Sequence, residues 1–250
     1  MKTIASDNSF SFQRFLLLIK RTAVLNQKSW LIGIASAFGL LIIIWFAPVL
    51  TILPAWHEYR IQNLLTPAIF FYTAGGLVIT SSLFDELHSP ATAFLNLTLP
   101  ATAFEKLFSA WLISAVLFTV ITLSGYFLLH LAIQLASMAF VPSFPQIQLF
   151  NPFEPEILED IFTYVFYNSL FLLGAVYFKK LNFIKTLLAL ILFFFILGII
   201  SGILTFYQPD NTLIVSLSVL TPAIAYSILT AIIVLMLFFS YIRLKNRQVA

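Results

Sequence analysis

Two groups of residues have the types and the spacing that chemistry requires. Asp85, Glu86 and His88 place two carboxylates and an imidazole close together, the side chains that bind metal ions. His130 and Gln134 lie one helical turn apart in a long apolar stretch. The spacing of Asp85, Glu86 and His88 does not suit a structural metal site. We expect Asp85 to His88 to be the solvated start of a loop. We expect His130 to be a satisfied or interfacial group; a membrane enzyme using His130, with Gln134, is the least favoured alternative.

The sequence lacks the motifs of several catalytic classes. There is no cysteine, which excludes disulfides and thiol chemistry. No G-x-x-x-x-G-K-[ST] loop occurs, so the chain cannot itself cradle ATP phosphates. No H-E-x-x-H or G-x-S-x-G occurs either, which removes the zinc protease and serine nucleophile motifs. We therefore expect no enzyme activity, no cofactor and no metal site in this chain.

Composition identifies the protein class. The chain is 61% hydrophobic and 9% charged, against roughly 25% charged residues in an average soluble domain. Long runs without Asp, Glu, Lys or Arg include 30–56, 61–84, 107–153, 161–178, 186–209 and 211–241. A hydrocarbon core of about 30 Å needs about 20 apolar residues in a helix. A membrane β-barrel would alternate apolar and polar residues, which 193–197 does not. An all-α integral membrane protein is predicted.

The apolar runs predict six membrane spans in one transmembrane domain, residues 1–250. The predicted spans are about 30–53, 64–84, 107–138, 161–178, 184–202 and 222–242. Thr221 and Pro222 suit a helix start, with threonine as the N-cap and proline at the first helical position. Residues 203–220 are apolar but interrupted at Pro209, and a short re-entrant or interfacial hairpin is expected there. One tilted span with a tight loop before it is the alternative.

The distribution of positive charge predicts the orientation. Lys and Arg collect in cytoplasmic loops, and with six spans all of the 13 such residues except Arg60 lie on one side. The loop between spans three and four instead carries Glu154, Glu156, Glu159 and Asp160. Both termini are therefore predicted to be cytoplasmic. The sequence pI of about 9.1 follows from this topology, and nucleic acid is not an expected partner. The predicted spans contain no Asp or Glu. Ion-driven carriers usually keep such acids within the membrane, so this absence counts against an ion-driven carrier.

The segment before span one, within residues 1–29, mixes aromatic and basic side chains. The residues that give it this character are Phe12, Arg14, Phe15, Lys20 and Arg21. Residues 10–28 are too charged to span the bilayer, so a helix lying in the cytoplasmic interface is expected. An ordinary helix packed on the bundle is the alternative.

The loop after span two contains a break followed by a helix start. Leu99 and Pro100 interrupt the chain, and Thr102 can cap the next helix, with Glu105 at capping-box spacing. Span three is therefore expected to begin in the cytoplasm near residue 103. Lys106 is then expected at the lipid headgroups.

On these residues the chain resembles the permease subunits of ABC transporters of the ABC-2 type. Such permeases often carry an "LPxS/T…EK" stretch after the second span, matched here by Leu99, Pro100, Thr102, Glu105 and Lys106. The family also has an amphipathic elbow helix before span one, six spans and both ends inside. The resemblance covers most of the chain as architecture, and as a motif only this loop.

The resemblance implies a role in ATP-driven transport, mostly export. Two permeases, as identical copies or paralogues, would pair in the bilayer around a pathway, and a separate ATPase would bind ATP and Mg. The loop that couples the ATPase to the spans would run from Asp85, Glu86 and His88 to Lys106, with the elbow beside it. The resemblance also implies that the chain is located in a bacterial cytoplasmic membrane. A non-transporting assembly or anchor subunit of a larger complex is the main alternative.

Overall fold

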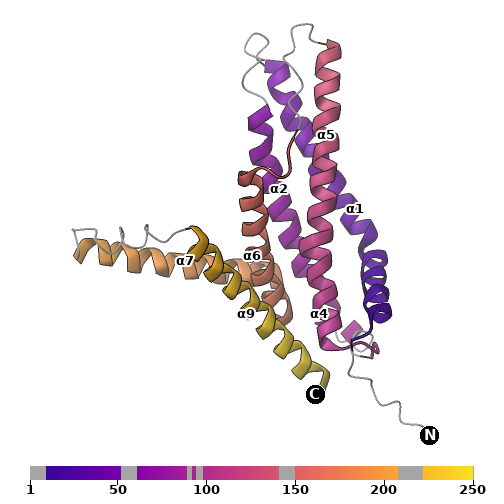
Figure 1. Cartoon of the computed structure of the whole chain (residues 1–250), viewed down its shortest axis with the longest axis vertical. Coiled ribbons are helices and arrows are strands. Elements are labelled where there is room, and N and C mark those ends of the chain that lie inside the picture. The colour runs from indigo at the N-terminus through magenta and orange to yellow at the C-terminus, as the bar shows by residue number, and fades with distance from the viewer. Residues whose placement is uncertain are drawn as a thin grey trace.

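The computed structural model describes residues 10–51, 61–88, 92–93, 98–140, 150–207 and 222–249. The elements are α1 (Phe12–Thr51), α2 (Ile61–Ser82), η1 (Asp85–Leu87), α4 (Ala103–Trp111), η2 (Leu112–Leu117), α5 (Phe118–Phe140), α6 (Pro155–Tyr177), α7 (Asn182–Tyr207) and α9 (Pro222–Val249). The described part of the chain contains helices and no strand (Figure 1). The predicted all-α class is confirmed.

The predicted number of membrane spans is also confirmed. By length and composition, 6 helices could cross a bilayer. They comprise residues Phe12–Ile44, Leu65–Leu87, Ala103–Ala136, Pro155–Tyr177, Asn182–Ile203 and Ile224–Arg247. The chain is therefore a multi-pass membrane protein.

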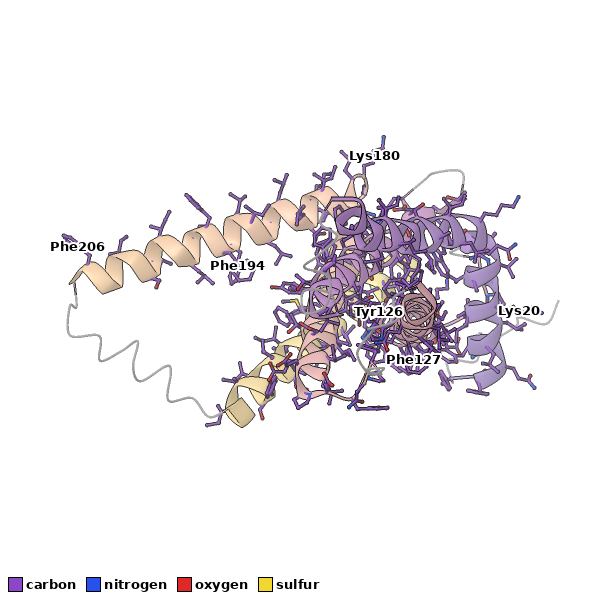
Figure 2. All side chains as sticks on the ribbon, turned by 90° about the horizontal axis from the view of Figure 1, so that it is seen from above. Lys20, Tyr126, Phe127, Lys180, Phe194 and Phe206 are labelled. Atoms are coloured by element: carbon purple, nitrogen blue, oxygen red, sulfur yellow. The ribbon has the colours of Figure 1, made fainter. Side chains whose placement is uncertain are left out.

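Helix α1 joins two segments that the sequence divides. It runs through 40 residues without interruption, from the expected elbow into span one. Residues 12–32 contain no glycine or proline, so nothing in that stretch ends the helix. Figure 2 shows that the part of α1 carrying Lys20 turns crosswise to the rest of the helix. The elbow is thus a change of direction within α1.

The third span begins where the sequence predicts. Thr102 caps α4, accepting a hydrogen bond from the backbone N–H of Glu105, whose side chain accepts from the N–H of Thr102. This reciprocal capping box satisfies two donors that a helix start leaves unpaired. The helix continues through the π-helical turn η2 into α5. Tyr164 on α6 donates to the carbonyl of Ser114 in η2 at 2.6 Å.

A buried polar network joins α2, η2 and α6. The amide of Asn168 donates to Thr80 Oγ1 at 2.7 Å, and Ser114 Oγ donates to Asn168 Oδ1 at 3.4 Å. Asn168 thus bonds to two neighbouring helical segments, α2 and η2. Gly76 lets α2 and α6 approach here, because a Cβ at this position would overlap the ring of Tyr164. In an apolar bundle such bonds fix which helix faces meet.

Helices α6 and α9 extend beyond their predicted limits. α6 begins at Pro155, in the first helical turn, so that Glu156, Glu159 and Asp160 lie on the helix rather than before it. Acidic groups at a helix N-terminus are stabilised by the helix dipole. α9 begins at Pro222 as predicted and continues to Val249, with Arg247 in its last turn. A basic residue at that end is stabilised for the same reason.

Helix α7 leaves the bundle. Figure 2 shows it extending from near Lys180, past Phe194, to Phe206, clear of the other helices. Every side chain in residues 191–203 is exposed. The expected hairpin at 203–220 is not tested: residues 203–207 belong to α7, and 208–221 lie outside the described residues.

Candidate functional site

The predicted coupling residues gather at one end of the bundle. Figure 1 shows the start of α1, the start of α4 and the end of α9 together at this end. The turn after α2 lies there too, because Arg21 bonds Glu86 and Arg247 bonds His88. The sequence predicts that these segments share a side of the membrane, and the structure brings them into contact.

Glu105 is the centre of this site. Its side chain is fully buried. Oε1 accepts hydrogen bonds from the backbone N–H of Ser11 at 2.7 Å and from Arg14 Nη2 at 3.0 Å. Oε2 accepts from the backbone N–H of Thr102 at 2.8 Å. A buried carboxylate is tolerable only when it is paired and hydrogen-bonded, and these donors meet that need. Glu105 therefore fastens the start of α1 to the start of α4.

Aromatic rings extend the same junction. The ring centroids of Phe15 and Phe108 are 5.3 Å apart and stacked, and those of Phe104 and Phe108 are 5.7 Å apart. Phe15 is buried, whereas Phe12 is exposed. Among the predicted elbow residues, Phe15 and Arg14 thus hold α1 against α4, and Phe12 and Lys20 face outward.

Arg21 makes the second link between the elbow and the loop. Its Nη2 lies 3.0 Å from Glu86 Oε2, and both side chains are about one third exposed, at 30% and 33%. An ion pair this accessible is screened by solvent and contributes little to stability. It can open without the cost of exposing a buried charge.

Lys106 is placed differently from the prediction. Its side chain was expected at the headgroups, but the residue is only 6% exposed. It borders a small cavity of about 30 Å³ with Leu18, Arg21 and Leu99. The reason is the capping turn, which fixes the start of α4 against α1 and directs Lys106 inward. Leu99 is half-buried beside it, and Pro100 is exposed.

His88 connects the loop to two further helices. Its Nε2 lies 2.7 Å from the carbonyl oxygen of Ala175, and its Nδ1 lies 3.3 Å from Arg247 Nη1. A carbonyl only accepts and a guanidinium only donates, so this geometry requires a neutral imidazole with its proton on Nε2. His88 thereby ties the turn after α2 to α6 and α9.

Asp85 completes the site with a contact to α7. Its Oδ1 accepts from Asn182 Nδ2 at 3.1 Å, at the start of α7. The run Asp85 to His88 was expected to be a solvated loop start; Asp85 is exposed and Glu86 is one third exposed, and each ionisable group in the run also has a protein partner. The partners come from distant segments, which is why spacing alone could not reveal them. Among the described residues no cluster of His, Asp and Glu could hold a metal ion.

His130 and Gln134 form a separate buried pair. Gln134 Nε2 and His130 Nε2 are 3.2 Å apart. The imidazole also lies 6.0 Å from the ring of Tyr126 and 6.5 Å from that of Phe150, measured between centroids. An amide and two aromatic rings are the surroundings of a packed histidine.

The sequence offers one indication of the contact between Glu105 and α1, which is charge complementarity. Arg14 and Glu105 are complementary charges in two segments predicted to lie on the same side. Sequence spacing does not show that the two side chains meet.

Comparisons with family models, curated proteins and solved structures found no match to this chain.

Proposed function

We propose that this chain is the permease subunit of an ATP-driven ABC transporter of the ABC-2 type, and an exporter. The observation that carries the proposal is the Arg14–Glu105 junction, which joins an elbow in α1 to the loop before α4. A separate ATPase subunit binds ATP and Mg. This chain supplies the loop that the ATPase moves and the helices that respond.

The contacts of the loop support this role. Glu105 links it to α1, His88 links it to α6 and α9, and Asp85 links it to α7. A displacement of the loop is therefore shared among several helices, because interfaces and packed cores move as units. Glu105 itself is buried and unable to touch a partner. The ATPase would instead contact exposed neighbours, namely Pro100 and Phe104.

The remaining parts of the proposal follow the same resemblance. Two permeases, identical or paralogous, form the pathway in a bacterial cytoplasmic membrane with both ends of each chain inside. The exposed side chains of α7 support pairing, since a second copy would cover apolar surface that this chain leaves bare. Bilayer lipid covers the rest.

The test is purification of the tagged chain from its native membrane in mild detergent, with mass spectrometry of co-purifying proteins. A stoichiometric protein containing G-x-x-x-x-G-K-[ST] is expected. The double variant Pro100→Ser/Phe104→Ser should weaken its recovery, because it alters the exposed surface beside the loop. Phe153→Ser is the matched control, since Phe153 is 78% exposed and precedes α6 on the opposite side of the predicted topology.

Two results would reject the permease role. One is recovery of the chain alone. The other is recovery only with partners that lack a nucleotide-binding motif, which would favour the assembly or anchor subunit. Loss of the ATPase with Phe153→Ser as well as with the loop variant would show that the loop is not the contact.

A further inference from the structure

A long groove lies between α1, α2 and α5. Its volume is about 670 Å³, within the range of about 300–1,000 Å³ typical of small-molecule sites. The middle of the groove is apolar, lined by Ile34, Phe38, Ala68, Gly75 and Phe118. On α2 the lining runs from Leu65 to Ser82, which at 1.5 Å per residue is about 26 Å. That length approaches the hydrocarbon thickness of a bilayer, about 30 Å.

One end of the groove is charged and polar. Arg21, Asp85 and Glu86 line it there, together with Asn26 and Ser29. This end holds one guanidinium and two carboxylates, and the Arg21–Glu86 pair within it is one third exposed. Asp160, in the first turns of α6, also lines the groove but lies away from this end, because the last turns of α6 contact His88. An apolar channel with a charged mouth matches an amphiphile in shape and in polarity.

We propose that the groove binds a zwitterionic phospholipid whose headgroup carries a primary ammonium, as in phosphatidylethanolamine. An acyl chain occupies the apolar part. The phosphate accepts hydrogen bonds from Arg21, and the ammonium donates to Glu86 and Asp85. The lipid replaces the Arg21–Glu86 pair with one partner for each side chain, so neither charge is left unpaired.

The charges at the mouth favour this headgroup over two others. A purely anionic headgroup, as in phosphatidylglycerol, has no cation for the two carboxylates and is repelled by them. A quaternary ammonium, as in phosphatidylcholine, has no N–H to donate. The proposal does not depend on the transport role, because it concerns this chain and its bilayer alone.

Fluorescence of Trp30, which lines the groove, provides the test. The full chain carrying Trp45→Phe, Trp56→Phe and Trp111→Phe is reconstituted in phosphatidylcholine vesicles. Lipids with brominated acyl chains and each of the three headgroups are added in turn, and quenching is followed against mole fraction. We expect brominated phosphatidylethanolamine to quench at about tenfold lower mole fraction than the other two, the scale of a charge-assisted hydrogen bond.

Two glycines on α1 provide a matched pair of variants. A Cβ at Gly33 or at Gly39 would meet nothing within 4 Å, but only Gly33 lines the groove. Gly33→Leu should fill the groove and abolish the preference, and Gly39→Leu should leave it unchanged. Glu86→Gln should shift the preference toward phosphatidylglycerol, because Arg21 is released while one carboxylate is removed.

Native mass spectrometry of the unmodified chain, released from nanodiscs with equal amounts of the three lipids, is an independent check. We expect retained phosphatidylethanolamine in the unmodified and Gly39→Leu chains and little in Gly33→Leu. Equal quenching by all three headgroups would overturn the proposal. So would a preference of the unmodified chain for phosphatidylglycerol, or unchanged lipid retention in Gly33→Leu.

Discussion

Arg14 on α1 and Glu105 on α4 lie 91 positions apart in sequence and meet at 3.0 Å, with the carboxylate fully buried. Removing this buried carboxylate takes one partner from Arg14 and leaves the backbone N–H of Ser11 without its acceptor. We expect Glu105→Ala to destabilise the protein by about 2–3 kcal/mol, as for lost hydrogen bonds to a charged group. Thermal unfolding in detergent measures the loss.

Glu86→Ala is the matched control for that experiment. It removes the acidic partner of the exposed Arg21 pair and should cost about 1 kcal/mol or less. Equal losses in the two variants would show that Glu105 is no more important to stability than a surface carboxylate.

Gly76 is expected to resist enlargement. A Cβ there would overlap the buried ring of Tyr164, and overpacking of this kind typically costs about 1–3 kcal/mol. Gly76→Ala should therefore lower the unfolding temperature. Gly198→Ala should not, because a Cβ at that position meets nothing within 4 Å. A neutral Gly76→Ala would mean that α2 and α6 are not in this close contact.

Asn168 should contribute to stability through its bonds to α2 and η2. Asn168→Ala removes the donor to Thr80 and the acceptor for Ser114. Hydrogen bonds between membrane helices are worth about 0.6 kcal/mol on average and up to about 1.7, so a loss of about 1 kcal/mol or slightly more is expected. Thr230→Ala, which removes only an exposed bond within α9, is the comparison. Equal unfolding temperatures for the two variants would contradict the network.

The predicted orientation can be tested directly because the chain has no cysteine. Single cysteines at the exposed positions Lys20, Lys180 and Glu154 should react with a membrane-impermeant maleimide. Lys20→Cys and Lys180→Cys should react only from the cytoplasmic side, and Glu154→Cys only from the outside, as the distribution of Lys and Arg requires. Labelling of Glu154→Cys from the same side as Lys20→Cys would refute the six-span topology.

Local features of the sequence were enough to predict the class of the protein and the number of its spans. Uncharged runs of about 20 residues must be helical in lipid, because a helix satisfies its own backbone groups. The start of α4 was equally local: Thr102 and Glu105 cap the helix across a fixed spacing, and the structure confirms it. Pro222 marked the start of α9 for a similar reason. Each of these features depends on residues that are close together in the sequence.

The tertiary structure decided which distant residues meet. Sequence spacing places Lys106 at the start of span three, but only the packing of α1 on α4 buries it. Sequence spacing also cannot show that Glu105 faces Arg14 or that His88 reaches Ala175. Nor can it show that α1, α2 and α5 enclose a groove beside Arg21. Membrane helices are apolar on nearly every face, so amphipathic periodicity does not indicate which face meets a neighbour. Short polar contacts and small residues such as Gly76 make that choice, and they act only once the helices are together.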